Sequence, residues 1–256
     1  NGPFTGVPFA LKDLGMQYQG VVTSNGSRLF SDCVATHNST LVQRYKAAGL
    51  VICGKSNTPE FGLATTTEPV LFGATHNPWK HGYSSGGSSG GASALVAAGI
   101  IPMAHASDGG GSIRIPASCC GLVGLKPTRG RIPLGPAQLE GWGGLSTTHA
   151  ITKSVRDSAT LLDISAGPEA GSPYHVPTQT GSFLGCVSTP LTQQKIGLCL
   201  TTFNGADLDP EVAEVTKTSA RQLENLGHAV ELTKIELNPD NVREAHGIVA
   251  ISHMGA

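Results

Sequence analysis

The sequence is poor in charged residues: Asp, Glu, Lys and Arg make up 14% of its 256 residues, against about 25% in a typical globular domain. The formal net charge is -1, and no block of Lys or Arg stands out. Proteins that bind nucleic acid or an anionic membrane surface carry clustered positive charge. The composition therefore argues against a nucleic-acid partner and against a membrane partner.

Long apolar runs and cysteine motifs are also missing. No apolar run reaches about 18 residues, the length that suggests a transmembrane helix, and no signal-like leader opens the chain. The six cysteines form no CxxC pair and no zinc-ligand spacing, and the nine histidines form no HExxH motif. We therefore expect reduced thiols, no metal, no cofactor and a soluble cytoplasmic protein.

Glycine, by contrast, is abundant, with 34 residues in the chain. The densest run, HGYSSGGSSGGASA at 81–94, has the composition of a flexible linker. A linker needs no folded element at its ends, but this run leads into a helical pattern, then a strand pattern and then the triple glycine at 109–111. We therefore expect the run to belong to the folded structure.

Short apolar runs alternate with helical patterns along the chain. Apolar runs bounded by turn residues predict buried strands, and apolar residues at i, i+3 and i+4 predict helices. The fold class that we predict from this alternation is α/β, with a mixed β-sheet layered between α-helices. The apolar runs are 7–11, 50–53, 101–106, 122–128, 195–200 and 228–237; the helical patterns are 38–49, 92–99, 155–166, 210–226 and the end of the chain from 248; and 167–190 is expected to be a surface connection.

Residues 49–56, GLVICGKS, match the phosphate-loop pattern GxxxxGK[ST]. In a phosphate loop the four variable residues form the loop between a strand and a helix. Here they are the apolar run itself, and Pro59 follows too soon for a helix to begin at Lys55. We interpret this match as a coincidence.

Residues 86–90, GGSSG, match the GxSxG nucleophile elbow of α/β-hydrolases, in which Ser88 would be the nucleophile. That elbow requires a strand immediately before it, whereas NPWKHGY reads as turn material. One of the downstream histidines His149, His175 and His228 would have to act as the base. A serine esterase of this type is a weaker alternative.

Three separated segments carry the most reactive combination of residues. They are Lys12 at the end of an apolar run, the pair Ser88 and Ser89 between two diglycines, and DGGGSIRIP at 108–116. Together these segments resemble the amidase signature family, and the spacing from Ser88 to Ser112 is similar to that of the family's two catalytic serines. The wording at 54–61, 66–79 and 124–131 also resembles this family, and is most similar to bacterial amidases of the 6-aminohexanoate cyclic-dimer hydrolase type.

The resemblance implies that Ser112 is the nucleophile, that Ser88 is a proton relay after a cis peptide bond at Gly87–Ser88, and that Lys12 is the base. Physically, Lys12 can accept a proton only when it is uncharged, because an ammonium group has no acceptor. Burial at the end of an inner strand lowers the pKa of a lysine. Ser88 can donate and accept at once, so it can carry a proton in both directions.

The resemblance also implies an oxyanion hole built from the backbone amides of Gly109, Gly110, Gly111 and Ser112. Side chains would obstruct such a concave anion site, which explains a run of glycines. The family often has a larger residue at the place of Gly109. The implied supporting residues are Ser89, Asp108 and Arg114, for which a simple turn serine and a surface ion pair are the alternatives that the residues leave open.

The implied function is the hydrolysis of a linear or cyclic carboxamide, a small-molecule partner, through an acyl-enzyme on Ser112. We expect residues 1–256 to form a single amidase signature domain that lacks the N-terminal helices and the C-terminal part of the family fold. A catalytically silent amidase-like subunit or fragment is the second hypothesis. The sequence does not fix the acyl or amine specificity, nor hydrolysis against transfer of ammonia, and it leaves a homodimer possible.

Overall fold

The computed structural model describes residues 2–202, 208–235 and 237–254. The chain forms two compact units, residues 1–188 and residues 189–256. Parts of two expected elements, position 236 and positions 255–256, lie outside the described residues. That residues 1–256 form one amidase signature domain stays a prediction.

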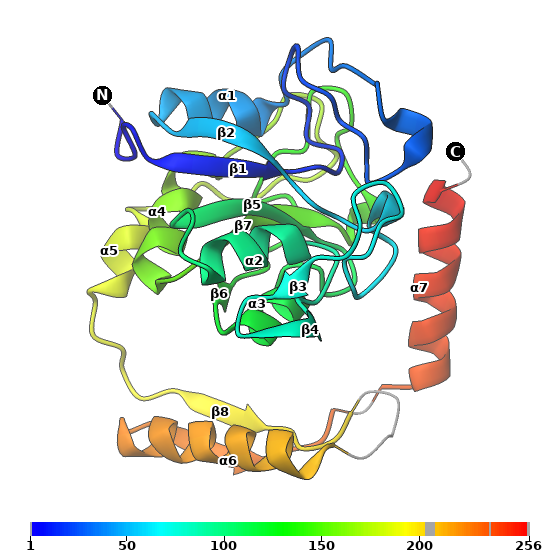
Figure 1. Ribbon diagram of the computed structural model, residues 1–256. Helices are drawn as coiled ribbons and strands as arrows, with labels where there is room; N and C mark the ends of the chain where they lie inside the picture. The colour runs from blue at the N-terminus through cyan, green and yellow to red at the C-terminus, as the bar shows by residue number, and fades with distance from the viewer. Residues whose placement is uncertain (1, 203–207, 236, 255–256) are drawn as a thin grey trace. The chain divides into compact units, whose positions relative to one another are not determined.

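The first unit is built on a five-stranded sheet with the strand order β2-β1-β5-β7-β6 (Figure 1). Strand β1 is parallel to β2 and β5, whereas β7 is antiparallel to β5 and β6. This mixed sheet, with helices packed against it, confirms the predicted fold class. The strands are β1 Pro8–Lys12, β2 Val51–Ser56, β5 Met103–Asp108, β6 Val123–Gly124 and β7 Thr147–Thr152.

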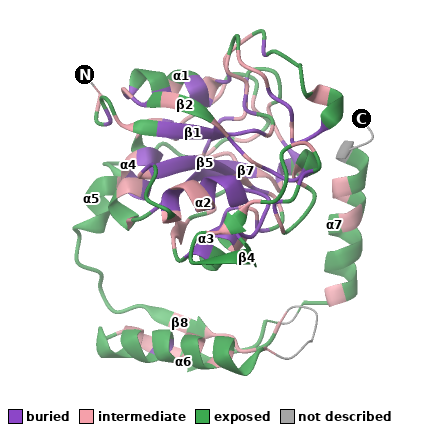
Figure 2. Ribbon diagram, viewed as in Figure 1, coloured by how far each residue is buried: buried purple, intermediate pink, exposed green. Residues whose placement is uncertain are grey.

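Helices cover the sheet and enclose an apolar cluster on each of its faces. Side chains alternate along a strand, so Phe9 and Leu11 of β1 join one cluster while Ala10 joins the other. Figure 2 shows that buried positions concentrate in β1, β5 and β7. The helices of this unit are α1 Thr40–Ala47, α2 Gly90–Ala97, α3 Arg114–Cys120, α4 Val155–Ser165 and α5 Phe183–Val187.

Local signals explain where these helices begin and end. Ser154 caps α4, because its hydroxyl accepts a hydrogen bond from the backbone N–H of Asp157 at 3.1 Å. Gly49 ends the turn after α1 with a φ of +90°, a conformation that other residues rarely adopt. A β-carbon at Gly49 would also lie 2.7 Å from the backbone of Thr5.

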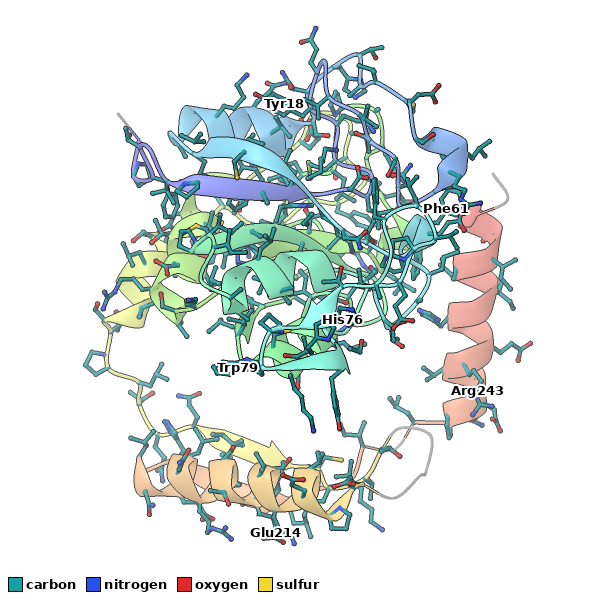
Figure 3. All side chains as sticks on the ribbon, in the orientation of Figure 1. Tyr18, Phe61, His76, Trp79, Glu214 and Arg243 are labelled. Carbon is teal, nitrogen blue, oxygen red and sulfur yellow. The ribbon has the colours of Figure 1, made fainter. Side chains whose placement is uncertain are left out.

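Several elements of the first unit were not predicted. Strand β7, with the sequence TTHAIT, is buried at all six positions, but its threonines and histidine give it no apolar run. Helix α3 follows the glycine-rich segment directly, and α5 lies within 167–190, which we expected to be a surface connection. The stretch NPWKHGY, expected to be turn material, contains most of a small hairpin of β3 His76–Asn77 and β4 Lys80–Ser84, with the 74% exposed Trp79 at its turn (Figure 3).

The second unit has the predicted strand-helix-strand order. Strands β8 Lys195–Leu198 and β9 Ala229–Leu232 are parallel and are joined by helix α6 Pro210–Asn225. Asp209 caps α6, and Pro210 occupies its first turn, where a proline needs no hydrogen-bonding N–H. Helix α7, Pro239–Met254, follows. Among the described residues, no helix has both the length and the apolar character needed to cross a membrane.

Candidate active site

Lys12 is the last residue of β1, and its side chain is fully buried in the first unit. Its Nζ lies 2.7 Å from the hydroxyl oxygen of Ser88 and 2.9 Å from that of Ser107. Both distances are those of hydrogen bonds. The structure therefore joins two of the three residues for which the sequence predicted a catalytic role.

Burial lowers the pKa of Lys12 from its ordinary value of 10.5 to about 7, and the negative charge of Asp108 opposes this effect only in part. The cause is desolvation, which disfavours the charged form of an amine. Near neutral pH a substantial fraction of Lys12 is therefore the free amine, which has a lone pair. This amine can accept a proton from the Ser88 hydroxyl.

The glycines around Ser88 are required by close approaches of other segments. A β-carbon on Gly87 would lie 2.5 Å from the carbonyl oxygen of Thr66, and one on Gly91 would lie 2.3 Å from the backbone nitrogen of Asn57. The predicted cis peptide bond between Gly87 and Ser88 is present. The run is thus a packed loop that leads into α2, as expected, and not a linker.

Ser89 and Ser107 connect this loop to β5. The Ser89 hydroxyl donates to the carbonyl oxygen of Ser107 at 3.3 Å, and the Ser107 backbone N–H approaches the Ser89 hydroxyl at 3.4 Å. Both distances are at the long end of the hydrogen-bond range. Since the Ser107 hydroxyl also contacts Lys12, this strand position links the loop to the lysine.

Asp108 organises the glycine-rich segment that follows β5. Its fully buried carboxylate accepts two hydrogen bonds from the Arg114 guanidinium, both at 2.9 Å, and others from the backbone N–H groups of Gly111 and Ile113. Burial alone would raise the pKa of Asp108, but the hydrogen bonds from Arg114 and from the backbone hold this pKa below its ordinary value. The ion pair between Asp108 and Arg114 is therefore part of the glycine-rich segment, although the Arg114 side chain is half exposed.

The backbone amides of the glycine-rich segment are not equivalent. The Gly111 N–H donates to Asp108 at 2.8 Å, whereas those of Gly109, Gly110 and Ser112 have no hydrogen-bond partner among the described residues. A β-carbon on Gly109 would lie 2.8 Å from the indole ring of Trp142. The indole thus occupies the space that a larger residue at this position would fill.

Ser112 lies between this segment and α3, and it is partly exposed. Among the described residues no hydrogen bond joins its hydroxyl to Ser88. The geometry therefore establishes the link between Lys12 and Ser88, while the link between Ser88 and Ser112 stays a prediction.

Sequence reasoning missed two residues that contact Lys12. Besides Ser107, the imidazole of His105 accepts a hydrogen bond from the backbone N–H of Lys12 at 3.3 Å. Both residues lie on β5 two positions apart; His105 falls within the apolar run 101–106 that predicted the strand, and Ser107 follows that run directly. Polar residues on one face of an otherwise apolar strand are the signal that could have identified them.

The alternatives to this site lack support from the geometry. The histidine proposed for an esterase that lies nearest in sequence, His149, contacts the Ser158 hydroxyl at 2.9 Å, and Ser88 contacts Lys12. The phosphate-loop match at 49–56 falls on strand β2, where the Lys55 amine donates to the Met16 carbonyl oxygen at 2.6 Å. This agrees with its interpretation as a coincidence. Among the described residues, no group of three or more His, Cys, Asp and Glu could hold a metal ion.

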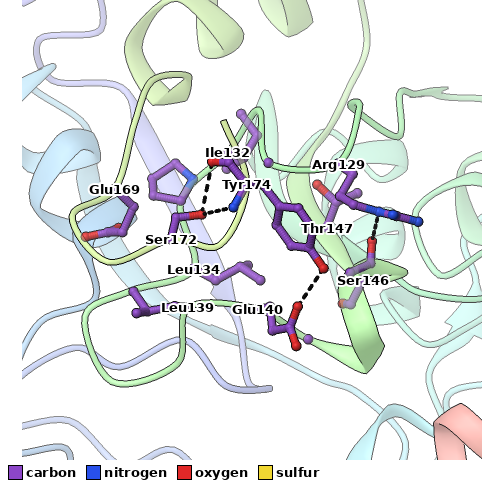
Figure 4. Close-up of a pocket in the computed structure, with 14 residues that line it drawn as sticks. Arg129, Ile132, Leu134, Leu139, Glu140, Ser146, Thr147, Glu169, Ser172 and Tyr174 are labelled. Carbon is purple, nitrogen blue, oxygen red and sulfur yellow. Dashed lines mark hydrogen bonds between the residues drawn. The ribbon is translucent and has the colours of Figure 1, made fainter. Parts of the chain in front are cut away.

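A pocket in the first unit lies outside this group of residues (Figure 4). Its walls come from 129–147 and 169–174, where the Tyr174 hydroxyl donates to Glu140. Thr147 in its wall pairs with Asp108 across the sheet. The pocket therefore adjoins the glycine-rich segment but contains none of the three predicted catalytic residues.

The fold and these contacts define an α/β protein in which a buried lysine, Lys12, is hydrogen-bonded to a serine, Ser88, in a glycine-rich loop. The family model described as Amidase matches residues 1–254, and the chain belongs to this family. The chain is 44% identical over 236 residues to the 6-aminohexanoate-cyclic-dimer hydrolase of Paenarthrobacter ureafaciens, an alignment that covers 90% of this chain and 48% of that protein.

Solved structures of related enzymes also match this chain. A structure of 6-aminohexanoate cyclic dimer hydrolase complexed with substrate matches with a TM-score of 0.87 and 42% identity, covering 91% of this chain and 49% of the other. A bacterial aryl acylamidase of the amidase signature family matches with a TM-score of 0.90 and 30% identity, covering 98% and 52%. The chain thus spans about half the length of the relatives that it matches.

Proposed function

We propose that the protein hydrolyses a carboxamide through an acyl-enzyme on Ser112, with Ser88 as proton relay and Lys12 as base. The observation that carries this proposal is the 2.7 Å contact between the buried Lys12 amine and the Ser88 hydroxyl. Membership of the amidase family supports it independently. An isolated buried lysine could serve structure alone, but an amine depressed to a pKa of about 7 is suited to proton transfer near neutral pH.

In the first half-reaction the Ser112 oxygen attacks the amide carbon, and the π electrons of the carbonyl move to its oxygen. The Ser112 proton passes to Ser88, whose own proton passes to Lys12. When the tetrahedral intermediate collapses, the C–N bond breaks, and the nitrogen takes a proton back from Lys12 through Ser88. The transfer requires a Ser112–Ser88 hydrogen bond in the substrate complex, and such contacts often tighten only there.

In the second half-reaction a water molecule attacks the acyl-enzyme in the same way. The water proton travels through Ser88 to Lys12. The breaking C–O bond returns its electron pair to the Ser112 oxygen, which takes a proton back from Lys12 through Ser88. The carboxylic acid leaves and the enzyme is restored. Lys12 begins and ends each half-reaction uncharged. It therefore accepts and returns a proton in both half-reactions, and its lowered pKa favours both transfers.

The oxyanion formed in both steps needs hydrogen-bond donors fixed in advance. We assign this role to the backbone amides of Gly109, Gly110 and Ser112, because they have no other partner among the described residues. The Gly111 amide, also expected in the hole, donates to Asp108. We infer that Asp108 and Arg114 hold the segment in shape and take no part in proton transfer.

For the substrate we propose a small linear or cyclic amide, since the relatives named above include a hydrolase of a cyclic amide dimer and an aryl acylamidase. A panel of aliphatic, aryl and cyclic amides separates these classes.

The described cysteines are all free, which fits the proposed cytoplasmic location; cell fractionation tests this location. Sedimentation analysis tests whether the protein is a homodimer.

The decisive experiment treats the natural full-length protein with a fluorophosphonate probe and locates the label by peptide mass spectrometry. Label on Ser112, lost in Ser112→Ala and retained in Ser118→Ala on the exposed side of α3, is the expected result. Label on Ser88 in an active preparation would contradict the proposal and favour the esterase. A folded protein with neither label nor amidase activity would favour the catalytically silent subunit.

A further inference from the structure

The backbone pairing between β1 and β5 ends before the catalytic lysine. The last paired positions are Ala10 and Ala104. Beyond them the backbone N–H of Lys12 donates to Nδ1 of the His105 side chain at 3.3 Å. An imidazole therefore takes the place that a backbone carbonyl of β5 would fill in a regular ladder.

His105 must be neutral and in a single tautomer. It is fully buried, and burial together with the positive charge of Lys12 lowers the pKa of His105 to about 3. Because its Nδ1 accepts a hydrogen bond, the ring proton lies on Nε2. The other groups that face it are Lys55 from β2, His149 from β7 and the ring of Tyr45 from α1, whose centroid lies 6.3 Å away.

Histidine at this position has a cost that an apolar residue would avoid. Its Nε2 is buried and has no hydrogen-bond partner among the described residues, which is unfavourable for a donor. An apolar side chain would remove that cost but would leave the Lys12 N–H without an acceptor. A carboxylate would accept the bond, but its negative charge would favour the ammonium form of Lys12.

The same strand also holds the other end of the lysine. His105 and Ser107 share one face of β5, because side chains alternate along a strand. His105 contacts the backbone of Lys12, and Ser107 contacts its Nζ at 2.9 Å. Two uncharged acceptors from one strand thus fix Lys12 at both ends.

We propose that His105 is a positioning residue for the Lys12 base: its Nδ1 fixes the lysine backbone, and so the reach of Nζ to Ser88, without placing a negative charge beside the amine. This inference rests on the proposed function, in which Lys12 is the base.

The test compares two neutral replacements in the natural full-length protein. His105→Asn keeps an acceptor oxygen close to the position of Nδ1, whereas His105→Leu has none. The rate constant for fluorophosphonate labelling of Ser112, corrected for the folded fraction, should fall by about tenfold to a hundredfold in the leucine variant, because small misplacements of a catalytic group have effects of this size. The asparagine variant should stay close to the wild type.

A charged replacement tests the second half of the proposal. His105→Asp supplies an acceptor with a negative charge, which should raise the pKa of Lys12 and move the acid limb of the labelling rate to higher pH. The asparagine variant should keep the wild-type limb. If the leucine variant does not fold, the comparison of asparagine with aspartate still tests the proposal.

His149→Leu is the matched control, since His149 is a second buried histidine but contacts Ser158. It should change the melting temperature and leave the labelling rate per folded molecule unchanged. A wild-type rate in His105→Leu, or equal losses in the leucine and asparagine variants, would overturn the positioning role. Failure of the wild-type protein to label at Ser112 would instead contradict the proposed function.

Discussion

Lys12 and Lys55 lie on the neighbouring parallel strands β1 and β2, and the side chains of both are withdrawn from solvent. The partners of the two amines differ in charge. Lys12 contacts two serine hydroxyls. Lys55 contacts the carbonyl oxygen of Met16 at 2.6 Å and the hydroxyl of Thr23 at 2.8 Å, and in addition has the carboxylate of Asp13 at 3.6 Å. Burial lowers the pKa of both lysines. Asp108 opposes this for Lys12 through its charge alone, whereas Asp13 opposes it for Lys55 through its charge and a hydrogen bond.

The difference shows that burial alone does not make a lysine a base. The Asp13 carboxylate stabilises the ammonium form of Lys55. The resulting ion pair holds the segment that follows β1 against β2. Hydroxyl partners leave the amine free to lose its proton, and one of them, Ser88, can pass a proton on. The different partners support the proposed catalytic role of Lys12 and indicate a structural role for Lys55.

The largest expected effect separates the two lysines directly. Lys12→Met should lower kcat/KM by about a thousandfold or more, because it removes the proposed base behind the proposed nucleophile. Lys55→Met should instead lower the free energy of unfolding by about 3 kcal/mol, since it leaves Asp13 buried without its cation. Amide-hydrolysis kinetics and denaturant unfolding of both variants check this. Equal activity losses per folded molecule would contradict the different roles proposed for the two lysines.

The pH dependence should follow Lys12. Below pH about 7 kcat/KM should fall by about tenfold per pH unit, because only the uncharged amine accepts a proton. Stability should move in the same direction: between about 7 and 10.5 the unfolded chain keeps the Lys12 proton that the folded chain has lost, so the wild type gains stability relative to Lys12→Met as pH rises. Unfolding curves of the two proteins at several pH values measure this, and a constant difference would contradict it.

A smaller effect is expected from the second hydroxyl partner of Lys12. Ser107→Ala should lower kcat/KM by up to about tenfold, because Lys12 loses one hydrogen bond but keeps Ser88. Ser56→Ala is the control, since Ser56 is buried on β2 and its hydroxyl approaches the Leu11 carbonyl oxygen at 3.3 Å. Steady-state kinetics of the two variants decide the matter, and a larger loss in the control would show that packing accounts for the effect.

The smallest effect on catalysis is expected from Asp13→Asn. It should lower the free energy of unfolding by about 1–3 kcal/mol, because the Lys55 ammonium loses its charged partner, and leave kcat/KM per folded molecule unchanged. The exposed Asp32 provides the control Asp32→Asn, for which no change in stability is expected. A marked activity loss in Asp13→Asn would show that the two lysines are coupled.

The fold was predicted where apolar periodicity was strong. Strands β1, β2 and β5 and helices α1, α2 and α4 coincide with apolar runs and helical patterns in the sequence. Strand β7 was missed because buried polar residues such as Thr148 and His149 interrupt any apolar run. Its place in the sheet depends on pairing with β5, a long-range contact that no local pattern reports.

The site was predicted in part. The combination of three motifs predicted Lys12 and Ser88 as site residues, and the fold brings them into contact. Ser107 and His105 were not predicted, since each is a single polar residue in a short strand. The engagement of the Gly111 amide by Asp108 also depends on how the loop folds back on itself, which glycine content alone does not specify.

The most direct test of this account is an NMR titration of the lysine side-chain amines, with Lys12→Met and Lys55→Met used to assign the two signals. Lys12 should titrate with a midpoint of about 7, and Lys55 should titrate at higher pH. A Lys12 midpoint close to the ordinary value of 10.5 would contradict its proposed role as the base.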